Sequence, residues 1–244
     1  MASKLFDYDN PFFMFMSRIW DLMILNFLAV LLCLPVITAG ASVTALYYIT
    51  LKMAEDRESH IYRSFLKAFR DNLVQSTAIH LIVTAAGAVL LLDFWYFVLG
   101  GRAPGASASD IFSAGIFSSG SPARFAAAAL LLALMLLYLF ITVYVYAIQA
   151  RFVNTVFKTI INAFMMAVRH LPSTVLMIIL NSVFFYTMFH YASWLGFWVL
   201  SGPVYLNSLL LCRIFKRYMQ TDAKEITESL FHNTTTMKLH ISFL

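Results

Sequence analysis

The sequence predicts an all-α membrane protein, a polytopic bundle of about six transmembrane helices with two amphipathic helices at the cytoplasmic surface. Of its 244 residues, 61% are hydrophobic and only 12% are charged, whereas a soluble globular domain carries about 25% charged residues. The mean hydropathy is +0.79. Apolar runs long enough to cross a bilayer recur along the chain, and most charges lie between them, so the composition excludes an ordinary soluble fold.

The first two spans are predicted from one stretch, Trp20 to Lys52, which is apolar for most of its length. Leu34-Pro35 interrupts this stretch and small residues follow, which favours two helices joined by a tight turn. The second helix is short, because its residues 38–53 extend only about 24 Å against a hydrocarbon core of about 30 Å. Protein packed around this helix, or a locally thinned bilayer, would accommodate it.

Hydropathy divides the chain into a single membrane domain, residues 1–218, and a cytoplasmic tail, residues 219–244. An aromatic lead-in that ends near Ser17 is expected to lie in the membrane interface. Residues 100–123 are rich in Gly, Ser, Ala and Pro and are predicted to form an extracellular loop. The six predicted spans are residues 19–34, 38–53, 76–99, 124–150, 171–190 and 194–212.

Two segments, residues 61–74 and 156–169, have the apolar periodicity of amphipathic helices. A shift of 95 positions aligns residues 61–69 with residues 156–164 and keeps the residue type at most positions. This similarity predicts an internal duplication of two units with the same orientation, and convergent patterning is the alternative. The apolar faces, which we expect to dock a partner, are Tyr62, Phe65, Phe69 and Leu73 in the first helix and Phe157, Ile160 and Phe164 in the second.

Lysine and arginine predict the orientation. All 17 of them except Arg102 and Arg124 fall before the first span, within residues 52–70 and 151–169, or after the last span. Six spans with both termini in the cytoplasm place these segments on the inner side, as the positive-inside rule requires. The excess of basic residues therefore indicates membrane orientation and not nucleic-acid binding.

The sequence predicts no catalytic residues, no metal site and no cofactor, and we expect a protein that is not an enzyme. Cys33 and Cys212 lie in apolar segments without a ligand-like spacing and are interpreted as small buried hydrophobes. His80 and His190 lie near opposite ends of spans and lack a paired carboxylate. No nucleotide-binding, nucleophile-elbow or zinc-protease pattern occurs.

Polar residues inside the spans are the remaining candidates for function, because such residues are costly in a bilayer. For the two carboxylates among them the alternative is a position at the interface. For the amides it is a hydrogen bond between helices, worth about 0.6 to 2 kcal/mol. The candidate polar path consists of Asp21, Asn26, Asp93, Asn181 and Asn207.

The turn after the first span carries a motif, LPVITAGAS, that includes Leu34, Pro35, Thr38, Gly40 and Ser42. With the following TALY string, Lys52 and the cluster Phe65, Phe69 and Asn72, it resembles the YesL family of bacterial membrane proteins. The resemblance is densest over residues 15–80 and looser to about residue 218. The resemblance implies a multi-pass protein of the bacterial inner membrane with unassigned activity, often encoded beside carbohydrate ABC importers and glycan-degrading enzymes. The loop at 100–123 and the tail beyond 218 depart from the family's shorter form.

Three functions are compatible with the sequence. The preferred one is an accessory or scaffold component of a carbohydrate ABC importer, whose subunits dock on the two amphipathic faces. The second is a small transporter or channel for sugar-like solutes, with a path lined by the spans' amides and by Tyr47, Tyr48 and Tyr186; convergence of this polar stripe on one cavity would favour it. The third is a structural or assembly role without a small ligand. The bilayer is a partner in each case, and Ala126–Ala129 offer a small-residue surface for a homo-oligomer.

Overall fold

The computed structural model describes residues 11–57, 60–98, 122–191 and 193–219, and it confirms the predicted all-helical membrane fold. Five described helices are long and apolar enough to cross a membrane: α1, α2 with the short turn before it, α3, α5 and α7. The elements are α1 (Pro11–Cys33), the 3-10 turn η2 (Val36–Thr38), α2 (Ala39–Ala54), α3 (Ile61–Val98), α5 (Pro122–Arg151), α6 (Val156–Arg169), α7 (Leu171–His190), the 3-10 turn η3 (Ser193–Trp198) and a last helix over residues 201–219.

Several helix bounds lie close to those expected from the sequence. α6 and α7 have the bounds of the predicted helices 156–169 and 171–190, and α2 and α5 differ by one or two residues at each end. α1 begins earlier, at Pro11, so much of the expected aromatic lead-in belongs to the same helix as the first span. Residues 100–121 of the predicted loop and 220–244 of the predicted tail lie outside the described residues.

The first amphipathic segment differs from the prediction, because residues 61–74 and the span expected at 76–99 form one helix, α3. No proline or glycine occurs between Ile61 and Ala86, so nothing in the sequence interrupts the backbone hydrogen bonds. In the corresponding later part of the chain Pro172 stands in the first turn of α7, where its missing N–H costs nothing, and the chain breaks at His170. α6 and α7 are therefore separate helices, while α3 is continuous.

The sixth predicted span, 194–212, is also not one helix. η3 is followed by Val199 and Leu200 in a turn, and the last helix begins at residue 201. Gly202 and Pro203 explain this start, because proline is tolerated in the first turn of a helix and disrupts a helix interior. The last helix is not among the five candidate spans of the described chain, and its final turns carry Arg213, Lys216 and Arg217.

Helix α2 is the centre of the molecule. Of its span, 61% is buried, compared with 11% to 22% for α1, α3, α5 and α7. Its Ala41, Ala45 and Leu46 pack with α1 and the start of α3, and its Tyr47 and Leu51 pack with α5, α6 and the last helix. Because protein surrounds this short helix, its limited length need not match the bilayer.

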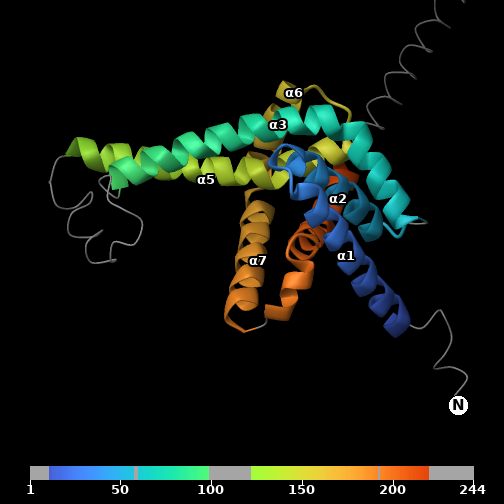
Figure 1. The fold of residues 1–244 in the computed structure, drawn as a ribbon. Coiled ribbons are helices and arrows are strands. Elements are labelled where there is room, and N and C mark those ends of the chain that lie inside the picture. The colour runs from blue at the N-terminus through green and yellow to red at the C-terminus, as the bar shows by residue number, and fades with distance from the viewer. Residues whose placement is uncertain (1–10, 58–59, 99–121, 192, 220–244) are drawn as a thin grey trace, which may run out of the picture.

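The other helices surround α2 in a branched arrangement. Figure 1 shows α3 and α5 running side by side, while α1 and α7 point away from this pair. The apolar outer parts of α3 and α5 contribute many of the chain's exposed side chains, including Leu91, Leu92, Leu130 and Leu132. Such side chains are suited to contact with lipid.

Candidate functional site

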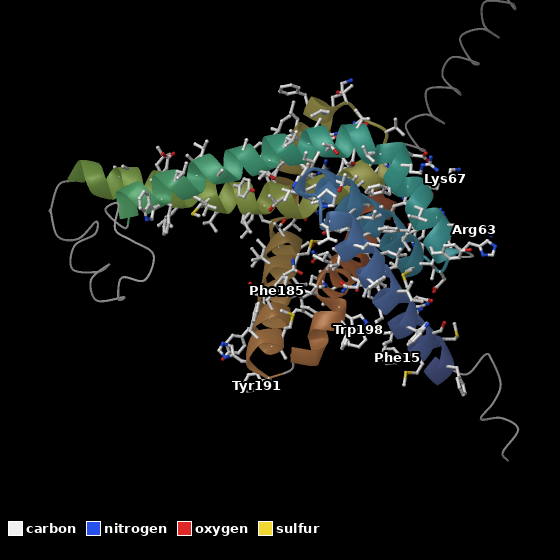
Figure 2. The ribbon with its side chains drawn as sticks, viewed as in Figure 1. Phe15, Arg63, Lys67, Phe185, Tyr191 and Trp198 are labelled. Atoms are coloured by element: carbon white, nitrogen blue, oxygen red, sulfur yellow. The ribbon has the colours of Figure 1, made fainter. Side chains whose placement is uncertain are left out.

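A cavity of about 440 Å³ lies between α2, α5, α7 and the start of the last helix. This volume is within the range of about 300 to 1,000 Å³ that small-molecule sites occupy. Its lining residues are Val43 and Tyr47 of α2, Leu139, Thr142, Val143 and Tyr146 of α5, Ile178, Asn181, Ser182 and Phe185 of α7, and Val199, Leu200, Pro203, Val204 and Asn207 at and after the turn. Figure 2 shows Phe185 on α7, well away from Tyr191 at the far end of that helix.

Hydrogen bonds to side chains of other helices hold two tyrosine hydroxyl groups of the cavity in place. The Asn207 amide Nδ2 donates to the Tyr47 hydroxyl at 3.3 Å, which joins α2 to the last helix. The Tyr146 hydroxyl lies 2.8 Å from His80 Nδ1, which joins α5 to α3. Tyr47 is only 4% exposed, so burial and these bonds fix the polar groups before any ligand arrives.

Two amide oxygens at the cavity are unsatisfied. Within the described part of the chain, Asn181 Oδ1 and Asn207 Oδ1 are buried and have no hydrogen-bond partner. Asn207 as a whole is 3% exposed. A buried acceptor without a partner costs about 1 to 3 kcal/mol, so both oxygens are suited to accept a hydrogen bond from a water molecule or a ligand hydroxyl that reaches them.

The described residues that line the cavity include no aspartate, glutamate, lysine or arginine. A charged ligand would therefore lose its hydration without gaining an opposite charge. The aromatic rings of Tyr47, Tyr146 and Phe185 add apolar contact area beside the polar groups. This combination suits a neutral molecule with several hydroxyl groups.

The cavity lies beside the middle of α7. Asn181 is ten residues beyond the start of α7, which corresponds to about 15 Å along a helix that is itself about 30 Å long. The turn at Val199 and Leu200 reaches the cavity at this depth, and irregular backbone inside a bilayer is tolerated where it is buried in protein or lines a cavity.

Asn26 of α1 stabilises that turn. Its side-chain oxygen accepts hydrogen bonds from the backbone N–H groups of Leu200 at 2.8 Å and Ser201 at 3.2 Å. These are N–H groups at the start of the last helix, which otherwise lack an acceptor in their own helix. Asn26, which belongs to α1, thus caps the N-terminus of the last helix. Trp198 contributes a second link to α1, because its indole N–H donates to the Ile19 carbonyl of that helix at 3.2 Å. Figure 2 shows Trp198 beside α1.

The structure brings together only part of the predicted polar path. Asn181 and Asn207 line the cavity, as does Tyr47, whereas Asp21, Asn26 and Asp93 do not. Tyr48 and Tyr186 are likewise not among the lining residues. Thr142 and Tyr146 line the cavity but were not singled out from the sequence, because nothing in the apolar run of α5 distinguishes the side that faces α7.

The turn motif lies outside the cavity and has a structural role. The Thr38 hydroxyl, with its single hydrogen, lies within hydrogen-bond distance of two carbonyl oxygens, Leu32 at 2.7 Å and Pro35 at 2.9 Å. The Ser42 hydroxyl donates to the Ala29 carbonyl at 2.9 Å. The Leu32 carbonyl lies in the last turn of α1 and has no N–H partner within that helix, and the bond from Ser42 to Ala29 joins α2 to α1. Gly40 lies against α3, and Leu34 is exposed.

The predicted docking faces differ in their exposure. Phe65 and Phe69 are buried against α1 and α2, and Leu73 packs on the same cluster, so these three are internal packing residues in this structure. Ile160 packs against the other cluster. Tyr62 is 52% exposed, Phe157 76% and Phe164 37%. Figure 2 shows Arg63 and Lys67 projecting outward from the first part of α3.

In the described part of the chain, no group of three or more His, Cys, Asp or Glu residues is placed to hold a metal ion. The fold and the cavity define a class: a helical membrane protein with an uncharged, mostly apolar cavity that a few polar side chains line. Residues 22–94 match the model of a family described as "Protein of unknown function, DUF624". The match covers much of α1, all of α2 and most of α3, and it includes the turn motif but only Val43 and Tyr47 of the cavity lining. Searches of curated proteins and of solved structures found no significant match.

Proposed function

We propose that this membrane protein binds a neutral, hydroxyl-bearing small molecule, such as a sugar, in the cavity and lets it cross the bilayer by facilitated diffusion. The observation that carries the proposal is the convergence of Tyr47, Asn181 and Asn207 on one cavity with two buried amide oxygens unsatisfied. Facilitated diffusion needs no coupling ion, which agrees with a cavity lined by uncharged side chains.

The turn before the last helix supports a role in transport. Substrate sites in transporters commonly lie near the bilayer midplane beside an interrupted helix, because the interruption exposes backbone groups and can change shape. Here Val199 and Leu200 form the interruption and line the cavity, and Asn26 holds it from α1. We propose further that the protein resides in the bacterial inner membrane with both termini in the cytoplasm, on the basis of its basic segments.

The proposal is tested with purified protein reconstituted in liposomes, by measuring uptake of labelled glucose, maltose and sucrose, with glucuronate as the charged comparison. At least one neutral sugar is expected to enter faster than in protein-free liposomes, and glucuronate is not. Asn181→Leu and Asn207→Leu each remove an acceptor and are expected to weaken sugar binding about ten-fold, which corresponds to about 1.4 kcal/mol.

Asn72→Leu is the matched control, because the Asn72 amide donates only to the Ala68 carbonyl of its own helix and does not line the cavity. It is expected to transport at the wild-type rate. Equal uptake by wild type and both cavity variants would refute the assignment of the site. Absence of uptake of any neutral sugar by folded, monodisperse protein would refute the transport function.

An accessory or scaffold role beside a carbohydrate ABC importer is a second proposal. It is now motivated mainly by α6, where Phe157 and Ile161 are exposed and leave an apolar surface open to a partner. Recovery of importer subunits in stoichiometric amounts from the native host, lost on Phe157→Asp, would support this role.

A further inference from the structure

A second hollow lies along α6. It is a groove of about 580 Å³ lined by Ile148, Phe152, Asn154, Asn162, Phe164, Met165, Met166, Val168, Arg169 and Tyr218. α6 forms most of it, the end of α5 closes one side, and the last helix contributes Tyr218. Because α5 and α7 are both candidate spans, the connecting α6 lies where the chain leaves and re-enters the bilayer.

The floor of the groove is apolar and deformable. Phe164, Met165 and Val168 are 37%, 62% and 46% exposed, although each is a side chain that water solvates poorly. Methionine is unbranched and polarisable, so Met165 and Met166 can follow the shape of a flexible chain. Such a surface at the level of the headgroups is suited to a hydrocarbon chain.

One end of the groove is positively charged. The Arg169 guanidinium lies over the Tyr218 ring, 5.3 Å from its centroid, and the Tyr218 hydroxyl lies 3.3 Å from His170 Nε2. The segment 151–170 contains Arg151, Lys158 and Arg169 but no acidic residue, and residues 201–219 likewise carry only basic charges. The Glu55 carboxylate at the end of α2 is buried and already paired with Arg151.

From these features we propose that the groove binds one anionic phospholipid, with an acyl chain along Phe164, Met165 and Met166 and the headgroup phosphate at Arg169. This binding site goes beyond the transport function and does not depend on it. The apolar floor distinguishes a lipid from a free phosphate, which would use only Arg169. The single sign of charge distinguishes an anionic lipid from a neutral one.

The surroundings of His170 agree with this assignment. Burial lowers the pKa of His170, and the positive charges of Arg169 and Arg217 lower it further. A phosphate bound at Arg169 would offset part of that positive potential. The His170 pKa is therefore expected to rise when the lipid binds, which NMR titration of the imidazole can follow.

The test measures binding of phosphatidylglycerol and of phosphatidylcholine with identical acyl chains to the full-length protein in detergent, by native mass spectrometry and by thermal stabilisation. Phosphatidylglycerol is expected to bind about five-fold more tightly, as estimated for one basic residue near an anionic surface. Arg169→Gln is expected to abolish this preference. Lys158→Gln is the matched control, because it removes the same charge from the same helix but does not line the groove.

Three results would contradict the proposed lipid site. Equal affinity for the two lipids, equal stabilisation by inorganic phosphate alone, or an equal loss of preference in Lys158→Gln and Arg169→Gln would each overturn it. If Arg169→Gln does not fold, Met165→Asp provides the decision, since it puts a carboxylate into the groove and is expected to prevent binding of phosphatidylglycerol. Unchanged binding by that variant would assign the lipid to another surface, and co-purification of a protein on this groove in place of lipid would also refute the site.

Discussion

At the scale of single residues, Gly40 sets how closely α2 approaches α3. A Cβ atom at this position would lie 2.6 Å from the Ser76 carbonyl oxygen and would overlap His80 Cβ. Both atoms belong to, or are directly attached to, the backbone of α3, so neither can move without displacing the helix. The glycine of the turn motif is thus explained by helix packing, and not by a ligand.

Gly40→Ala is therefore expected to destabilise the protein. Alanine gains about 0.5 to 1 kcal/mol over glycine from helix propensity, but overpacking a close contact costs about 1 to 3 kcal/mol. We expect the second effect to dominate and the melting temperature in detergent to fall. Gly196→Ala is the control, because nothing lies within 4 Å of its added Cβ. An unchanged melting temperature for Gly40→Ala would show that α2 and α3 are further apart.

The polar residues show how far sequence reasoning extends at this scale. Hydropathy singled out Asn26, Asn181 and Asn207, and the structure gives each of them specific surroundings. Their roles differ, because Asn26 caps a helix 174 residues away while the other two line the cavity. Such distant partners depend on packing, which a single sequence does not specify.

At the scale of elements, a buried ion pair joins the ends of α2 and α5. Arg151 binds Glu55 through two nitrogens, at 2.9 Å and 3.3 Å, and the Glu55 side chain is only 3% exposed. The Cys212 thiol donates to the same carboxylate at 3.4 Å, and Arg151 also contacts Met219, so the last helix is included. Three elements thus depend on one carboxylate at the end of α2, where a negative charge is otherwise unfavourable for the helix dipole.

Removal of one partner is expected to be costly. Arg151→Met leaves the buried Glu55 with Arg57, at 3.5 Å, as its remaining cation in the described part of the chain, and should lower the free energy of unfolding by about 3 kcal/mol. The double variant Glu55→Met with Arg151→Met should recover most of the loss, because it removes both charges. Unfolding titrations in mixed micelles measure these differences.

The exposed pair between Arg18 and Asp56 is the control. Its side chains are 38% and 72% exposed, and Arg18→Met is expected to cost less than about 1 kcal/mol. A cost for Arg151→Met as small as that of Arg18→Met would contradict the view that the Glu55 pair holds the three elements together.

Helix positions were more predictable than helix interruptions. The apolar periods of α2, α6 and α7 are long and clearly bounded, and the structure places these helices within a residue or two of the expected bounds. Two features were predicted wrongly: a boundary was expected within α3, where the helix is continuous, and no interruption was expected at residues 199–200. A continuous polar-to-apolar helix has no boundary signal, and Gly202-Pro203 was treated as the interior of a span although proline favours a helix start.

At the scale of the whole molecule, the basic segments gather on one side. Arg18 pairs with Asp56, Arg151 pairs with Glu55 and reaches Met219, and α6 follows directly after Arg151. Segments far apart in the sequence therefore meet at one end of the membrane domain. The turn at Leu34–Thr38 and the end of α7 at His190 are separated from that end by whole spans.

This arrangement predicts the accessibility of single cysteines introduced into a chain whose Cys33 and Cys212 are replaced by alanine. Val153 and Tyr191 are both strongly exposed, and in the sequence Val153 precedes α7 whereas Tyr191 follows it directly. Because we propose from the positive-inside rule that residues 151–169 lie in the cytoplasm, Val153→Cys is expected to react with a membrane-impermeant maleimide only after the cells are permeabilised. Tyr191→Cys is expected to react in intact cells.

Two further positions serve as matched controls, because they repeat the test across α2. Arg57→Cys is expected to behave like Val153→Cys, and Val36→Cys like Tyr191→Cys, since a complete candidate span separates them. Reaction of all four from one side would contradict the crossing of α2 and α7. If Val153→Cys and Arg57→Cys react in intact cells and the other two variants do not, both spans are supported but the basic side lies outside. That result would refute the proposed cytoplasmic termini.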